Sequence, residues 1–194
     1  MSLMRVIVTG IMAMLLASSA LGATGDTCAD AITTVPGTSF FNTSSNTDSG
    51  LPVEGNCIYM GAMSRDIWFS YTPSEDGGVT ATTCAPGSFD TSILIYHGTP
   101  GGCDDLIYIA CNGDAEYDPA CQIYHSRVEF IATGGFEYFI RIGGYSPDEG
   151  GAGLLGLSFE KQPNPCACHA DIDEDGMIDV NDLLTVIANW GGCP

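Results

Sequence analysis

The chain has 194 residues, and its 24 acidic side chains outnumber five lysines and arginines to give a formal net charge of −19. A surface this acidic repels nucleic-acid phosphates and anionic membrane headgroups, which excludes both as partners, and it favours divalent cations. The length suits one domain with a short appendage.

Residues 1–23 have the pattern of a secretory signal peptide. Arg5 precedes an apolar stretch, and the small residues Ala20 and Gly22 follow near the expected cleavage site. A membrane-spanning helix needs about 20 apolar residues in succession, and a Thr-Gly pair interrupts this stretch. No later stretch suits insertion into a membrane, so we expect a secreted protein.

Short runs of alternating apolar and polar residues fill residues 24–160. In DIWFSYT, Ile67 and Phe69 alternate with Trp68 and Ser70, which predicts a strand with one face toward a core. Turn-forming Pro-Ser, Gly-Gly, Asn-Gly and Pro-Gly pairs separate the runs at the spacing of antiparallel sheets. We therefore expect a mainly β, two-sheet sandwich. FEYFIRIGG (136–144) alternates in the same way and predicts a second strand with one core face. The other expected strands are GVTATTC (78–84), SILIYH (92–97), LIYIAC (106–111), SRVEFIA (126–132) and LLGLSF (154–159).

All nine cysteines follow the signal peptide. In an exported chain of this size they indicate disulfide bonds, with one thiol left over. Six of them lie in the expected sandwich, where spacing alone leaves 15 pairings open. The pairs that we expect are Cys103–Cys111, Cys28–Cys57 and Cys84–Cys121.

Several stretches resemble the pre-peptidase C-terminal domains of secreted bacterial proteins. In chain order they are DTCADAI, DIWFSYTP, SFDTSILIYHG, CDDLIYIACNGD, SRVEFIATGGFEYFIRIGGY and GLSFE, which span most of residues 26–160. The resemblance implies a jelly-roll-like antiparallel β-sandwich without catalytic activity. After Cys111 the family often has Asn-Asp-Asp, whereas this chain has Asn-Gly-Asp, which argues against a family cation site there.

A proline-containing linker, residues 161–167, separates the sandwich from a tail of residues 168–194. Pro163 and Pro165 prevent both a helix and a regular strand in this segment. We expect Cys168 and Cys193 to join the two ends of the tail, which leaves Cys166 unpaired.

Acidic residues of the tail follow the spacing of a calcium-binding loop. Counting from Asp171, Gly176 stands at position six, where the loop turns sharply. An aspartate occupies position twelve, where EF-hands carry a longer glutamate, so magnesium is an expected competitor. The predicted Ca²⁺ ligands are Asp171, Asp173, Asp175, Met177 (main-chain carbonyl), Asp179 and Asp182.

After this loop, Leu183, Val186, Ile187 and Trp190 follow a helical period, and Gly191 ends the run. No helix is expected before the loop. This half-motif, with cysteines at its ends, resembles a single-copy dockerin tail. The resemblance implies docking to a cohesin-like protein, but a single half leaves its apolar face open to the sandwich, a second copy or a surface receptor. We favour a receptor or a role in sorting.

No catalytic sequence motif is present, and the histidines at 97, 125 and 169 stand in unrelated settings. We therefore predict a secreted or cell-surface binding protein that is not an enzyme. Its sandwich would bind an extracellular polysaccharide, another polymer or a protein, and its calcium-loaded tail would dock or anchor it. The alternative is a small extracellular hydrolase, or an accessory module of one, for which Asp90 and His97 are the residues to test. Trp68 and Tyr145 are interpreted as core or loop residues rather than sugar-stacking platforms.

Overall fold

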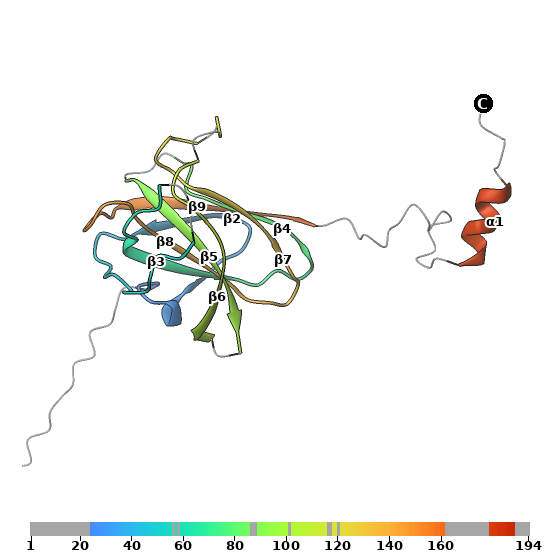
Figure 1. Ribbon diagram of the computed structural model, residues 1–194, viewed down its shortest axis with the longest axis horizontal. Helices are drawn as coiled ribbons and strands as arrows, with labels where there is room; N and C mark the ends of the chain where they lie inside the picture. Colours follow the sequence, from blue (N-terminus) through green and yellow to red (C-terminus); the bar gives the residue numbers. More distant parts are fainter. Residues whose placement is uncertain are drawn as a thin grey trace, which may run out of the picture.

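The computed structural model describes residues 24–55, 57, 59–85, 89–100, 102–115, 118–119, 121–161 and 179–188, the last range without its side chains at 185, 186 and 188. Within these residues, nine strands form two facing sheets, and one short α-helix follows them (Figure 1). This arrangement confirms the mainly β sandwich expected from the alternating runs.

Each of the seven predicted runs overlaps one strand from β3 to β9, whereas β1, β2 and the short 3-10 turn η1 (Cys28–Asp30) were not predicted. The helix α1 covers Val180–Ala188 and matches the helix predicted after the loop. The strands are β1 (Ile32–Thr33), β2 (Gly37–Asn42), β3 (Ser64–Tyr71), β4 (Gly77–Thr82), β5 (Thr91–Thr99), β6 (Gly102–Asn112), β7 (Arg127–Ala132), β8 (Tyr138–Gly144) and β9 (Ala152–Lys161).

The strand order is β1-β3-β8-β5-β6 in the five-stranded sheet and β2-β9-β4-β7 in the four-stranded sheet. All neighbours are antiparallel except β1 and β3. Strand β9, the last in sequence, therefore lies between β2 and β4, and long connections bring distant parts of the chain together.

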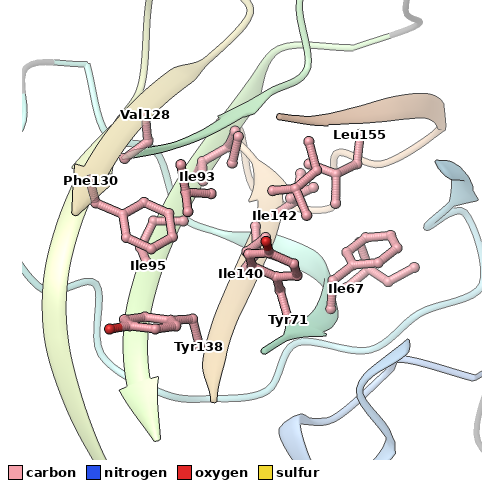
Figure 2. Packing of buried hydrophobic residues seen from close by; sticks show 14 of the residues in the cluster. Ile67, Tyr71, Ile93, Ile95, Val128, Phe130, Tyr138, Ile140, Ile142 and Leu155 are labelled. Atoms are coloured by element: carbon pink, nitrogen blue, oxygen red, sulfur yellow. The ribbon is translucent and has the colours of Figure 1, made fainter. Parts of the chain in front are cut away.

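The main hydrophobic core lies between the two sheets (Figure 2). Ile93, Ile95 and Ile140 project into it from the five-stranded sheet, and Val128 and Leu155 do so from the other sheet. Burying a side chain of this size contributes about 1.5–3 kcal/mol, so this layer holds the sheets face to face.

Strands β3 and β8 are buried on both faces, so the prediction of a single core face was wrong for them. The described residues of the segment 43–63 lie over the outer face of the five-stranded sheet. The carbonyls of Leu51 and Pro52 accept from Arg141, and Met60 and Met63 pack in the cluster that contains Trp68, so both Trp68 and Arg141 are buried. Arg141 forms a buried ion pair with Asp66 and also donates hydrogen bonds to main-chain carbonyls of this segment. Alternation in the sequence could not reveal this covering segment.

Three disulfides join the described cysteines, and two of the expected pairings were wrong. Cys103 and Cys111 both lie on β6, and eight residues of extended strand span about 26 Å, which is too far for a bond. Both bond to the N-terminal part of the chain instead. The observed pairs are Cys28–Cys103, Cys57–Cys111 and Cys84–Cys121, of which the last was predicted.

Candidate functional site

An open groove of about 670 Å³ crosses the outer face of the four-stranded sheet. Strand residues alternate between faces, so the neighbours of buried Val79 and Phe130 point outward here. The strand register then places the outward residues in three rows across β7, β4 and β9: Ile131–Gly78–Glu160, Glu129–Thr80–Ser158 and Arg127–Thr82–Gly156.

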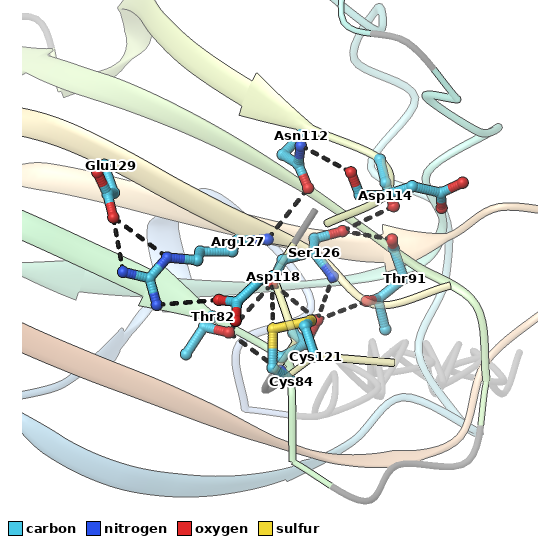
Figure 3. The surroundings of a disulfide bond; sticks show 12 residues. Thr82, Cys84, Thr91, Asn112, Asp114, Asp118, Cys121, Ser126, Arg127 and Glu129 are labelled. Carbon is cyan, nitrogen blue, oxygen red and sulfur yellow. Dashed lines mark hydrogen bonds and ion pairs between the residues drawn. A yellow bond between two sulfur atoms is a disulfide. The ribbon is translucent and has the colours of Figure 1, made fainter. Parts of the chain in front are cut away.

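Arg127 is the one basic residue among those that line the groove in the described part of the chain. Its Nε and Nη2 atoms donate to Glu129 Oε1 at 3.1 and 2.6 Å, and its Nη1 lies 3.3 Å from Asp118 Oδ2 (Figure 3). Glu160 adds a further negative charge. The charged side chains of the groove are therefore mainly acidic, and its guanidinium is already paired with carboxylates.

A buried hydrogen-bond network supports the start of β7, next to the Cys84–Cys121 disulfide (Figure 3). The Ser126 hydroxyl donates to the carbonyls of Thr91 and Gly113, at 2.5 and 3.0 Å. The Ser126 amide donates to the Thr83 hydroxyl at 3.0 Å. This network fixes the backbone from which Arg127 projects into the groove.

Of the predicted calcium ligands, Asp171, Asp173, Asp175 and Met177 lie outside the described residues, as do the signal peptide and the linker after residue 161. Asp179 and Asp182 are described, and they form a capping box at the start of α1. The Asp179 carboxylate accepts a hydrogen bond from the main-chain N–H of Asn181 at 2.7 Å. The Asp182 carboxylate accepts one from the main-chain N–H of Asp179, also at 2.7 Å.

The helix that follows keeps an exposed apolar face, which consists of Val180, Leu183, Leu184 and Ile187. It is not long and apolar enough to cross a membrane, and nor is any other described helix.

His125 and Ser126, neighbours in sequence, do not form a catalytic pair. His125 is buried, and its Nδ1 has no hydrogen-bond partner, while the Ser126 hydroxyl bonds to main-chain carbonyls. Burial lowers the pKa of His125 below its usual range. His97 packs against the rings of Phe136 and Tyr138, so its surroundings are aromatic.

Asp90 lies in a small acidic cluster away from the groove lining. Burial, together with the negative charges of Asp114 and Glu149, raises the pKa of Asp90 to about 6. Its Oδ1 atom is buried without a hydrogen-bond partner. No set of three or more metal-ligating side chains is placed to hold an ion among the described residues. The cluster offers one carboxyl that exchanges its proton near pH 6, well above the ordinary range of an aspartate.

Trp68 is fully buried, with its ring stacked on Tyr96 at 5.7 Å and the Arg141 guanidinium 5.5 Å from its ring centre. This confirms its interpretation as a packing residue. Tyr145 is exposed on a loop.

Sequence reasoning missed the groove on the four-stranded sheet. The alternation of exposed and buried residues along β7, with Arg127, Glu129 and Ile131 facing outward, could have indicated an exposed sheet face. The pattern alone does not show which strands lie beside β7, so the groove emerges only from the sheet order.

No protein-family model matches the chain, and no curated protein sequence does. Among solved structures, it is similar to the pre-peptidase C-terminal domain of a collagenase from Bacillus anthracis, with 12% identity and a TM-score of 0.41, over 66% of this chain and 94% of that one. It is also similar to CorA, a surface-associated copper-binding protein of Methylomicrobium album BG8, with 10% identity and a TM-score of 0.42, over 67% of this chain and 98% of that one.

Proposed function

We propose that the protein is a secreted, non-catalytic binding protein that holds an extracellular polymer or protein in the groove of its four-stranded sheet. The groove itself carries this proposal. It is open along the sheet, it is lined by hydroxyl, charged and apolar side chains, and a disulfide and a buried network support the strand that carries its one guanidinium. Such a surface binds a ligand through side chains without needing a reacting group.

The groove is tested by binding of the mature chain to a panel of immobilised extracellular polysaccharides and proteins. Ser158 is exposed and lines the groove, so Ser158→Arg fills it with a long charged side chain. We expect this variant to lose at least tenfold in affinity. Thr38→Arg is the matched control, since Thr38 is an exposed strand residue outside the groove lining, and it should bind normally. Equal losses in both variants, or in neither, would refute a ligand in the groove.

The tail is proposed to bind Ca²⁺ through Asp171, Asp173, Asp175, the carbonyl of Met177, Asp179 and Asp182. Spacing in the sequence supports this ligand set, and the capping box of Asp179 and Asp182 supports a helix that starts directly at the end of the loop. Five carboxylates repel one another without a cation, so binding should fold the loop.

Calorimetric titration with CaCl₂ compares the mature chain with the double variant Asp171→Ala, Asp173→Ala. The variant should lose the binding heat and the rise in melting temperature that calcium produces. Asp104→Asn, an exposed acid on β6, should keep both. Unchanged binding by the double variant would place the ion elsewhere, and a parallel titration with MgCl₂ measures selectivity.

The calcium-loaded tail is further proposed to dock the protein to a surface receptor or a cohesin-like partner. The exposed apolar face of α1 supports this role, because an amphipathic helix of this kind is normally covered. Removing residues 166–194 should release the protein from the cell surface into the medium, while the Asp104→Asn chain stays attached. Equal attachment with and without the tail would contradict the docking role.

A small extracellular hydrolase is the second candidate, and the raised pKa of Asp90 is the observation in its favour. Turnover of a polysaccharide or protein substrate that is lost in Asp90→Asn, but kept in Ser158→Arg, would establish it.

A further inference from the structure

We propose that the ligand of the groove is a neutral, hydroxyl-rich polysaccharide chain. This inference rests on the proposed binding function and narrows its ligand to one chemical class.

Gly78 leaves space open on the floor of the groove. Packing within the fold does not require a glycine at this position. A Cβ atom added at Gly78 would have one neighbour within 4 Å, the main-chain oxygen of Glu160 at 3.9 Å. At the adjacent Gly77, a Cβ would lie 2.5 Å from both the Glu160 oxygen and the Phe159 ring. Packing therefore requires glycine at 77 but not at 78. Glycine inside a strand costs about 0.5–1 kcal/mol relative to alanine, so Gly78 keeps space open on the floor at the expense of stability.

The charges of the groove disfavour an anionic ligand. Arg127 is held by Glu129 and Asp118, while Glu160 contributes a further carboxylate. Just beyond the groove, the Lys161 ammonium lies 2.5 Å from a Glu75 carboxylate oxygen. An acidic polysaccharide would meet carboxylates without an uncommitted cation among these residues. Sugar hydroxyls both donate and accept, so they can bond to the carboxylates, the guanidinium and the Thr80 hydroxyl without a countercharge.

The sheet order also disfavours an extended peptide. Strand β4 pairs with β7 on one side and β9 on the other, and β9 pairs with β4 and β2. The main-chain groups of β4 and β9 beneath the groove are therefore used within the sheet, so a peptide could add as a further strand only at the outer edge of β7, beside the groove rather than in it. Recognition has to come from side chains, which suits a ligand that carries hydroxyl groups along its length.

Ile131 provides an apolar surface at the end of the row that contains Gly78. Ile131 lines the groove and is 65% exposed. The C–H faces of sugar rings pack on such surfaces while their hydroxyls reach the polar rows. Adjacent strands of a sheet lie about 4.8 Å apart, so β7, β4 and β9 together give the groove a width of about 10 Å. This width is enough for one polysaccharide chain.

Affinity electrophoresis of the full mature chain tests the ligand class, with hydroxyethylcellulose, laminarin or galactomannan in the gel as neutral probes. Alginate serves as the anionic probe and gelatin as the protein probe. We expect at least one neutral polysaccharide to retard the chain and alginate to have no effect. The variant Gly78→Val fills the groove with a side chain, so its affinity for the polysaccharide should fall at least tenfold. Because valine is favoured in strands, the melting temperature of this variant should stay the same or rise. Thr38→Val, on the same face outside the groove, should bind normally.

The outcomes separate this inference from the proposed function. Retardation by gelatin alone, lost in Gly78→Val and Ser158→Arg, would overturn the polysaccharide assignment and leave a binding groove in place. If a neutral polysaccharide retards the chain and neither variant reduces this retardation, the polysaccharide binds outside the groove and the proposed site is wrong. Failure of all three neutral probes would overturn the ligand class. Should Gly78→Val lose stability, Ser158→Arg supplies the same test at an exposed position.

Discussion

At the scale of single residues, the buried pair of Asp66 and Arg141 holds the covering segment 43–63 on the five-stranded sheet. Asp66 accepts from the Ser49 amide and hydroxyl at 3.0 and 2.5 Å, so its charge is fully hydrogen-bonded. A buried pair of this kind owes its importance to the cost of leaving either charge alone. Its loss should therefore weaken the whole outer layer.

We expect Asp66→Ala to lower the free energy of unfolding by about 3–5 kcal/mol, because Arg141 stays buried without its partner. Urea denaturation followed by circular dichroism measures this change. Glu75→Ala removes the exposed pair with Lys161 and is the control, with an expected change of about 0–1 kcal/mol. Similar changes in the two variants would show that the buried pair contributes no more to the free energy of unfolding than the exposed pair does.

Asp90 should make stability depend on pH. Its pKa is about 6 in the folded chain against an ordinary 3.8, so the folded state binds the proton more tightly. The carboxyl therefore destabilises the fold above about pH 6, and this penalty disappears as the pH falls toward 3.8. We expect Asp90→Asn to raise the melting temperature at pH 7.5 and to have little effect at pH 4. Asp104→Asn, on exposed β6, is the control, and an Asp90→Asn effect equal at both pH values would contradict the prediction.

At the scale of elements, β6 is the strand that the disulfides hold most tightly. Cys103 and Cys111 lie near its two ends, and each bonds to the N-terminal part of the chain. Since β6 is the edge of the five-stranded sheet, only β5 pairs with it. The two bonds compensate for the missing neighbour.

Removing the Cys28–Cys103 bond in the double variant Cys28→Ser, Cys103→Ser should lower the free energy of unfolding by about 2–4 kcal/mol, because the unfolded chain loses a 75-residue crosslink. Urea denaturation checks the magnitude. The mixed variant Cys28→Ser, Cys57→Ser breaks two bonds, so it should lower the free energy of unfolding further. If Cys28 and Cys57 were bonded to each other instead, this variant would break one bond and lower the free energy of unfolding by the amount expected for one bond.

At the scale of the whole molecule, charge is the dominant feature. With a formal net charge of −19, like charges repel across the folded surface. Raising NaCl from about 0.1 to about 1 M shortens the screening length from about 10 to about 3 Å. We expect the melting temperature to rise over this range with EDTA present, so that no specific cation contributes. A melting temperature that falls or stays level would contradict this.

Much of the sandwich could be predicted from the sequence, because short apolar runs between turn residues mark β3 to β9. Strand β2 was missed because Phe40 and Phe41 are adjacent, one exposed and one buried, which hides the alternation. The groove could not be predicted, since it depends on β4 lying between β7 and β9 in the sheet. In the tail the helix followed from the sequence and the calcium loop stays a prediction, whereas the capping contact of Asp182 needed atomic positions.

The connectivity of β6 has a consequence for how the protein is made. If the chain is secreted as proposed, with its N-terminus exported first, Cys28 and Cys57 would reach an oxidising compartment before their partners Cys103 and Cys111. An oxidase that joins cysteines in order of arrival makes the Cys28–Cys57 bond first. The native bonds then form only after thiol–disulfide exchange with the later cysteines. Folding yield in a heterologous host should thus depend on a disulfide isomerase as much as on an oxidase.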